Sequence, residues 1–294
     1  MKKISNFYSP PQGHWVGDGF PVRSLFNYNR MGAEQISPFL LLDYAGPHEF
    51  APAQTPRGVG SHPHRGFETV TIVYEGEVEH RDSSGGGGVI AQGDVQWMTA
   101  GDGIVHQEFH SPSFTQKGGL FEVVQLWVNL HAKNKTTAPR YQSIVANSIP
   151  TVTLANNAGL VRVIAGQYQN TQGPAQTFSP INVWDIRLNP NGKAQFSVPL
   201  GHTVMVVTLS GTVQINADRI MRAADLAVFA HRGTEISIEA NTDAKLLLLS
   251  GEPIDAPVIG YGPFVMNSID DIKTSIEAFQ NGEFGQIAHE VTRS

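Results

Sequence analysis

The chain has 294 residues, of which 40% are hydrophobic and 16% are charged, and its formal net charge is −6 at pH 7. This composition predicts an ordered globular protein with a sizeable core, and the length favours two domains over one. The negative charge and the lack of a Lys/Arg run argue against direct nucleic-acid binding, and the absence of cysteine excludes disulfides, thiol nucleophiles and thiolate-bound clusters.

The N-terminus and the hydropathy of the chain indicate neither export nor a membrane span. Met1, Lys2 and Lys3 begin like the charged region of a signal peptide, but no apolar segment follows them. No apolar run approaches the length of a transmembrane helix. We therefore expect a cytoplasmic protein that does not bind membranes.

Short β-prone segments dominate the first half of the chain. Residues 39–43 form an apolar run typical of a short buried strand, and the Pro- and Gly-rich residues 46–56 are expected to form a loop. A longer strand is predicted at residues 62–74, where polar and apolar residues nearly alternate. Residues 93–100 and 122–130 are rich in β-prone side chains and predict two further strands.

Between these strands lies a glycine-rich stretch. After a turn at Glu75 and Gly76, residues 80–82 are expected to continue as a more exposed segment, and residues 83–88 as a flexible loop. No Lys-Ser/Thr pair follows the glycines and no helix pattern begins there, which argues against a phosphate-binding loop.

Two pairs of potential metal donors stand out, His62 with His64 and His106 with Glu108. Each pair has i, i+2 spacing, so on a β-strand its two side chains point to the same face. A lone histidine on a strand is usually structural, but two such pairs on neighbouring strands of a barrel can surround one cation. Three imidazoles and a carboxylate suit iron, nickel, cobalt, manganese or zinc.

Glu68 is the alternative to Glu108 as the carboxylate donor. It shares strand parity with His62 and His64, but it lies four residues beyond His64, roughly 13 Å along a regular strand. Glu108 needs no distortion of the strand. We therefore choose Glu108, and whether Glu68 contributes to the site stays open.

The other histidines show no clear partner spacing. His110 continues the parity of His106 and Glu108, but Pro112 indicates that the strand is ending, so we expect His110 to be peripheral. Arg65 should face away from the metal donors and form a structural ion pair. Solvent exposure is expected for His14, His48, His80, His131, His202, His231 and His289.

The second half of the chain repeats the pattern of short strands. Residues 203–211 align with 68–76, which indicates an internal repeat. In that register Ser197 and Pro199 replace the first histidine pair, so the second copy is predicted to be metal-free. The β-prone runs have the regular spacing of an all-β sandwich or barrel. They lie at residues 181–188, 194–198, 203–209, 212–215, 226–229, 235–238 and 245–249.

The clearest helix of the sequence lies near the C-terminus. Ser268 can cap its N-terminus, with Asp271 at the capping-box position. Asn281 and Gly282 should end it. One apolar face of this helix is expected to pack on a barrel, and it is formed by Ile269, Ile272, Ile276 and Phe279.

Four stretches resemble signatures of the pirin family of bicupins. They are residues 62–70 (His-Pro-His-Arg-Gly-Phe-Glu-Thr-Val), 93–101 (Gly-Asp-Val-Gln-Trp-Met-Thr-Ala-Gly), 103–108 (Gly-Ile-Val-His-Gln-Glu) and 261–267 (Tyr-Gly-Pro-Phe-Val-Met-Asn). The resemblance covers nearly the whole chain, and runs of this length are not expected by chance.

The resemblance implies an all-β fold of two tandem cupin β-sandwich or barrel domains with a short C-terminal helix. We place the metal-binding domain at residues 1–140 and a metal-free domain with the helical tail at 141–294. One divalent metal ion is implied, with iron(II) as the first candidate and nickel, cobalt, manganese, zinc or copper as alternatives. Its ligands carry over onto His62, His64, His106 and Glu108.

The resemblance also implies two functions from different classes. Some family members are similar to flavonol 2,4-dioxygenases, commonly called quercetin 2,3-dioxygenases, which open a flavonol ring with O2 and release carbon monoxide. Here a flavonol-like aromatic would be the substrate, and Glu108 the catalytic general base. Other members act through protein partners, so a metal-containing regulatory module is the alternative, and whether the chain is an enzyme is left open.

Overall fold

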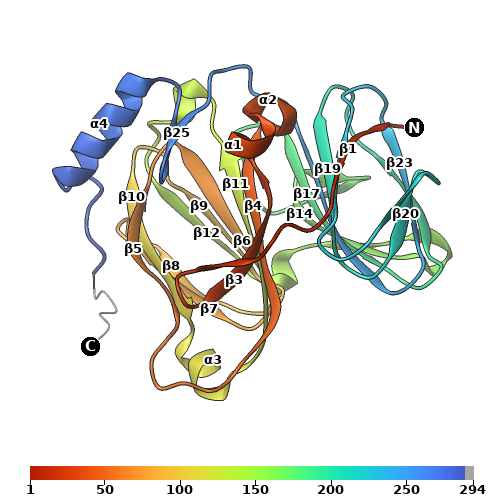
Figure 1. Ribbon diagram of the computed structural model, residues 1–294, viewed down its shortest axis with the longest axis horizontal. Coiled ribbons are helices and arrows are strands. Elements are labelled where there is room, and N and C mark those ends of the chain that lie inside the picture. The colour runs from red at the N-terminus through yellow and green to blue at the C-terminus, as the bar shows by residue number, and fades with distance from the viewer. Residues whose placement is uncertain (289–294) are drawn as a thin grey trace. The chain divides into compact units, whose positions relative to one another are not determined.

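The computed structural model describes residues 1–288, which form two compact units (Figure 1). The first unit comprises Gly13–Ser24, Leu40–Ala146 and the chain from Ile254 onwards, and the second comprises Met1–Gln12, Leu25–Phe39 and Asn147–Pro253. Each unit therefore contains segments from distant parts of the sequence. The division at residues 140 and 141 stays a prediction.

The first unit is a sandwich of a seven-stranded and a four-stranded antiparallel sheet. The larger sheet has the spatial order β12 (Arg140–Ile144), β9 (Val95–Thr99), β6 (Phe67–Glu75), β11 (Gly119–Asn129), β4 (Phe39–Phe50), β3 (Phe20–Asn27) and β2 (His14–Val16). The smaller sheet has the order β5 (Gly58–His64), β10 (Ile104–His110), β7 (Val78–Asp82) and β8 (Gly87–Ile90). Apolar side chains from both sheets pack into a common core, as alternation on each strand requires.

The predicted strand at residues 62–74 is in fact two strands that belong to different sheets. β5 ends at His64 and β6 begins at Phe67, with Gly66 at the corner. Gly66 has a φ of 88°, and a Cβ there would lie 2.1 Å from the carbonyl oxygen of Val265. A side chain is excluded at this corner by both backbone conformation and space. Because of this corner, Glu68 lies in the larger sheet, whereas His62 and His64 lie in the smaller one.

The predicted loop at residues 46–56 begins too early. β4 continues through Gly46 and Pro47 to Phe50, so the apolar run at 39–43 is only its first half. The predicted strands at 93–100 and 122–130 correspond to β9 and β11.

The second unit repeats the strand connectivity of the first except at one edge of its larger sheet, where the N-terminal β1 takes the place of β12. Its larger sheet has the order β1 (Ile4–Tyr8), β22 (Leu226–Phe229), β19 (Thr203–Ser210), β24 (Ala244–Gly251), β17 (Ile181–Leu188), β14 (Gly159–Ala165) and β13 (Thr151–Thr153). Its smaller sheet has the order β18 (Lys193–Ser197), β23 (Glu235–Ala240), β20 (Val213–Ile215) and β21 (Arg219–Met221). In this match β19 corresponds to β6 and β22 to β9, as the predicted repeat requires. Phe196 of β18 and Ile236 and Ile238 of β23 lie in the apolar core of this unit.

The remaining elements are short, and one helix longer than two turns lies within residues 1–288. They are α1 (Tyr28–Met31), α2 (Ala33–Ile36), α3 (Pro112–Lys117), α4 (Ile269–Gln280), the 3-10 turns η1 (Ala132–Asn134), η2 (Ala146–Ser148) and η3 (Ala155–Asn157), and the hairpins β15 (Gln167–Tyr168) with β16 (Thr171–Gln172) and β25 (Ile259–Tyr261) with β26 (Phe264–Met266). Over these residues no helix has the length and hydropathy needed to cross a membrane.

The C-terminal helix α4 packs against β25 and β26 in the first unit (Figure 1). The Ser268 hydroxyl accepts the Asp271 backbone N–H, and the helix ends before Asn281, so its predicted bounds are confirmed. The predicted apolar face is only partly correct, because Ile269 is 65% exposed. The helix instead buries Ile272 in a cluster that includes Phe264 and Phe284.

Candidate metal centre

The two donor pairs lie on adjacent antiparallel strands of the smaller sheet. β5 ends with His62 and His64, and β10 carries His106 directly opposite His62. The ring centroids of His62 and His106 are 4.3 Å apart, and that of His64 is 4.9 Å from each. One potential ligand atom from each ring lies within 4.8 Å of the others. The three imidazoles therefore converge.

The hydrogen bonds of these rings leave one nitrogen of each available. Nδ1 of His62 is 2.8 Å from the Gly60 carbonyl oxygen and Nδ1 of His64 is 3.4 Å from that of Pro263, so each Nδ1–H can donate to a carbonyl. That tautomer leaves the Nε2 lone pair free. Nε2 of His106 is buried and has no hydrogen-bond partner among the described residues. A buried nitrogen in this state is costly unless something binds it.

Burial keeps two of the imidazoles neutral. It lowers the pKa of His64 and of His106 well below the ordinary value, and the nearby His62 acts in the same direction. A neutral imidazole is the form that binds a cation.

Glu108 lies beside the imidazoles, held by two hydrogen bonds. A register shift after His106 places Glu108 opposite Val59. The Thr71 hydroxyl donates to one carboxylate oxygen at 3.3 Å, and the Gln125 amide donates to the other at 3.0 Å. An oxygen of Glu108 lies within 4.8 Å of potential ligand atoms of His106 and His80. His106 is thus common to both donor groups.

A cavity of about 440 Å³, including its opening to solvent, adjoins the site. Its polar lining is His62, Glu108, Gln125 and Asp43, and its apolar lining is Val16, Phe20, Val22, Ala45, Val59 and Val123. Asp43 accepts a hydrogen bond of 2.5 Å from the Ser24 hydroxyl, and burial raises its pKa. A mostly apolar lining with a few polar groups is typical of small-molecule sites. Sequence reasoning missed Asp43, because it appeared only as the end of an apolar run.

Family models cover most of this architecture. The model described as Pirin matches residues 19–128, and the model described as Pirin C-terminal cupin domain matches residues 183–285. The chain belongs to the pirin family. The predicted all-β bicupin fold is therefore confirmed.

Relatives of this pirin resemble it along almost their whole length. It is 56% identical to "Putative quercetin 2,3-dioxygenase PA2418" of Pseudomonas aeruginosa, over 97% of this chain and 99% of the relative. It is 37% identical to a pirin-like protein of Caulobacter vibrioides, over 93% of this chain and 96% of the relative. A crystal structure of quercetin 2,3-dioxygenase from Acinetobacter baumannii has 53% identity and a TM-score of 0.95, covering 98% of this chain and 100% of that chain.

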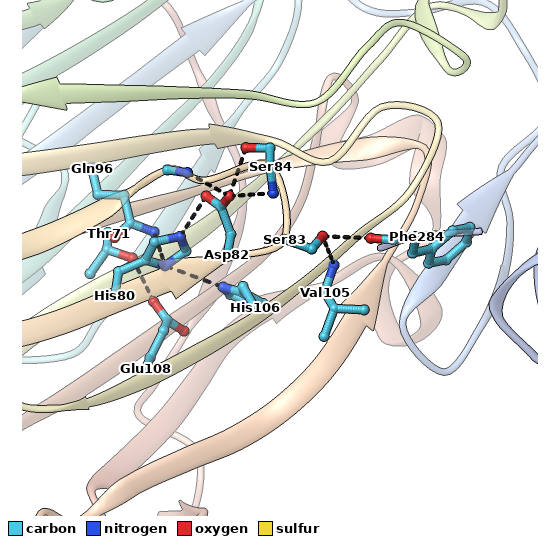
Figure 2. A network of polar contacts seen from close by, with 11 residues as sticks. Thr71, His80, Asp82, Ser83, Ser84, Gln96, Val105, His106, Glu108 and Phe284 are labelled. Atoms are coloured by element: carbon cyan, nitrogen blue, oxygen red, sulfur yellow. Dashed lines mark hydrogen bonds and ion pairs between the residues drawn. The ribbon is translucent and has the colours of Figure 1, made fainter. Parts of the chain in front are cut away.

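His80 is the main error of the sequence-based interpretation of this pirin. It was expected to be exposed, but it is fully buried, with Asp82 at 3.1 Å and His106 at 3.4 Å (Figure 2). His80 and Asp82 have the same i, i+2 spacing on β7 as the two donor pairs have on their strands. That spacing was the available signal.

Glu68 and Arg65 lie outside both donor groups of this pirin. Glu68 is buried and accepts a hydrogen bond of 2.7 Å from the Thr99 hydroxyl, and burial raises its pKa to about 7. Arg65 forms an ion pair of 2.5 Å with Asp102, as predicted.

The expectations for the other histidines were partly correct. His110 is buried rather than peripheral, because its ring packs 4.5 Å from that of Phe50 and its Nε2 contacts the Gly19 carbonyl oxygen at 2.9 Å. His14 and His231 are exposed, as expected, whereas the other three within residues 1–288 are half-buried and His289 lies outside the described residues. The half-buried ones are His48, His131 and His202.

Proposed function

We propose that the first unit is a metal-dependent dioxygenase site for flavonols such as quercetin. The proposed ligands are His62, His64, His106 and Glu108, and iron(II) is the first candidate metal. The observation that carries the proposal is the buried Nε2 of His106, which has no hydrogen-bond partner within residues 1–288. It lies beside two further imidazoles, one of which lines an apolar cavity. The names of the Pseudomonas and Acinetobacter proteins support the substrate class.

The donor set fits a borderline divalent cation. Burial keeps His64 and His106 neutral, so their lone pairs are available without loss of a proton. Imidazole nitrogens with one carboxylate suit iron and its neighbours in the first transition row, whereas calcium and magnesium prefer oxygen donors. When bound, such a metal supplies a Lewis acid that makes the 3-hydroxyl of a flavonol more acidic.

Glu108 is the proposed acceptor of the proton of that hydroxyl. Its carboxylate lines the cavity, and the hydrogen bonds from Thr71 and Gln125 hold both of its oxygens in position. Gln125 is oriented in turn by the Trp127 indole, which donates to its amide oxygen at 3.4 Å. A base held in this way is already oriented for proton transfer, which lowers the entropic cost of reaching the reactive geometry. The Glu108→Gln variant should therefore lose turnover, and it should retain metal because the three imidazoles remain and the amide oxygen can still face the ion.

The cavity walls suit a flat aromatic ring system. Apolar side chains from β2, β3, β4 and β11 line the cavity, and they would exclude water from the reacting ring. Asp43 adds one polar acceptor, which can receive a hydrogen bond from a ring hydroxyl of the substrate. The proposed reaction opens the flavonol ring with uptake of O2 and release of carbon monoxide.

The test begins with metal analysis of the purified protein, followed by anaerobic loading with iron(II) and addition of quercetin and O2. Loss of the flavonol absorbance with release of carbon monoxide is expected for the wild type and absent in His62→Ala. The matched control is His231→Ala, because His231 is exposed in the second unit. Stoichiometric metal without turnover would overturn the enzyme proposal and favour a regulatory module that acts through a protein partner.

A further inference from the structure

A buried network of polar groups connects His106 to His80 and Asp82 (Figure 2). Nδ1 of His106 lies 3.4 Å from Nδ1 of His80, and Nε2 of His80 lies 3.1 Å from a carboxylate oxygen of Asp82. His80 and His106 are both fully buried and Asp82 nearly so. Buried polar groups in a continuous chain constrain one another strongly.

The contacts of Asp82 determine which nitrogen atoms of His80 and His106 carry the protons. Its Oδ1 accepts the backbone N–H groups of Ser84 and Gly86 at 2.9 and 3.0 Å and the Ser84 hydroxyl at 2.6 Å. These contacts hold Asp82 as a carboxylate, and together with His80 they keep its pKa below the ordinary value despite burial. A carboxylate only accepts hydrogen bonds, so the His80 proton must be on Nε2.

With its proton on Nε2, His80 presents an acceptor at Nδ1. The Gln96 amide nitrogen lies 3.0 Å from this atom and donates to it. The Nδ1–H of His106 is the second donor that faces it. His106 is thereby held in the tautomer whose lone pair is on Nε2, the atom that has no hydrogen-bond partner in the described part of the chain.

Gly86, in the glycine-rich residues after β7, lies too close to Asp82 and Tyr141 to carry a side chain. A Cβ on Gly86 would lie 2.6 Å from the second carboxylate oxygen of Asp82 and 2.7 Å from the Cβ of Tyr141. The Tyr141 ring stacks on that of His80, with centroids 5.1 Å apart and an interplanar angle of 23°. This stretch was expected to be a flexible loop, but it encloses Asp82, at one end of the series of buried polar groups.

We propose that His80 and Asp82 are positioning residues that orient His106 and fix its tautomer for metal binding. The proposal rests on the proposed metal site but not on its substrate. A second cation between His80, His106 and Glu108 is disfavoured, because both His80 nitrogens already have partners. Partners of this kind behind a ligating imidazole typically change metal affinity by about 10–100-fold.

The first measurement needs no metal. Nitrogen-15 NMR of the apo protein at one fixed pH should show His106 protonated at Nδ1 and His80 at Nε2. Asp82→Asn should change this pattern, because an amide can donate to His80 Nε2 and reverse its tautomer. A His106 proton on Nε2 in the wild type would overturn the proposal, whatever the protein does with flavonols.

The second measurement is cobalt(II) affinity, obtained by competition with a chelator and followed by the visible absorption of the bound ion. Asp82→Asn and His80→Leu should bind about 10–100-fold more weakly, with a shifted spectrum. His80→Gln, which can still accept from His106, should recover part of the loss. Tyr141→Phe keeps the stacked ring and serves as the packing control. Wild-type affinity and spectrum in both Asp82→Asn and His80→Leu would overturn the proposal.

Discussion

Alanine at position 58 should push apart the two strands that carry the metal donors. Gly58 is buried in β5 and lies opposite Phe109 of β10, next to the residue pairs that bring His62 and His106 together. A Cβ there would lie 2.2 Å from the Glu108 carbonyl oxygen and 2.6 Å from the Phe109 Cα. Both obstructing atoms are backbone, so no side-chain rotation can relieve the contact.

The size of the effect follows from these distances. Ordinary contact would require the strands to separate by about 1 Å, and overpacking of this kind typically costs about 1–3 kcal/mol of unfolding free energy. The same displacement would move His106 and Glu108 relative to His62. An error of about 1 Å can cost about 100-fold in turnover, so activity should fall further than stability.

Gly60→Ala is the matched control for this experiment. Gly60 is on the same strand, two residues away, and a Cβ there would meet no atom of residues 1–288 within 4 Å. For both variants, urea denaturation gives the change in stability, quercetin turnover gives the change in activity, and cobalt(II) titration gives the metal affinity. If Gly58→Ala had the stability and metal affinity of Gly60→Ala, close approach of β5 and β10 would not be what holds the donors together.

Three other variants test separate features of the first unit. Burial raises the pKa of Glu68 from its ordinary 4.5 to about 7 in the folded protein. The stabilising contribution of the protonated side chain is therefore fully present below about pH 4.5 and is lost as the pH rises through 7. This loss lowers the free energy of unfolding by about 3 kcal/mol. Urea denaturation of Glu68→Gln should show a smaller fall in stability between pH 5 and 8.5; an unchanged pH slope would contradict the assignment. Lys135 donates to three buried oxygens at 2.7, 2.7 and 2.8 Å, so Lys135→Met should lose about 3 kcal/mol in the same assay, and a loss below 1 kcal/mol would count against this role. Gln125→Leu removes a donor to Glu108 and should lower quercetin turnover by about 10-fold at unchanged metal content; unchanged turnover would argue against positioning by Gln125.

The sequence by itself determined the elements whose information is local. Alternation and spacing placed β17 and β22 with their correct bounds, and the Ser268 cap located the start of α4. The i, i+2 spacing of His62 with His64 and of His106 with Glu108 was sufficient to put each pair on one face of a strand. All of these depend on residues within a few positions of one another.

Only the tertiary structure decided which strands lie next to each other. The corner at Gly66 depends on the backbone of Val265, about 200 residues away, and it moved Glu68 to another sheet. His80 is buried because β7 pairs with β10 in a register that places Glu108 opposite it. Strand periodicity states which residues share a face but not which strand pairs with which, because register is set by packing between distant segments.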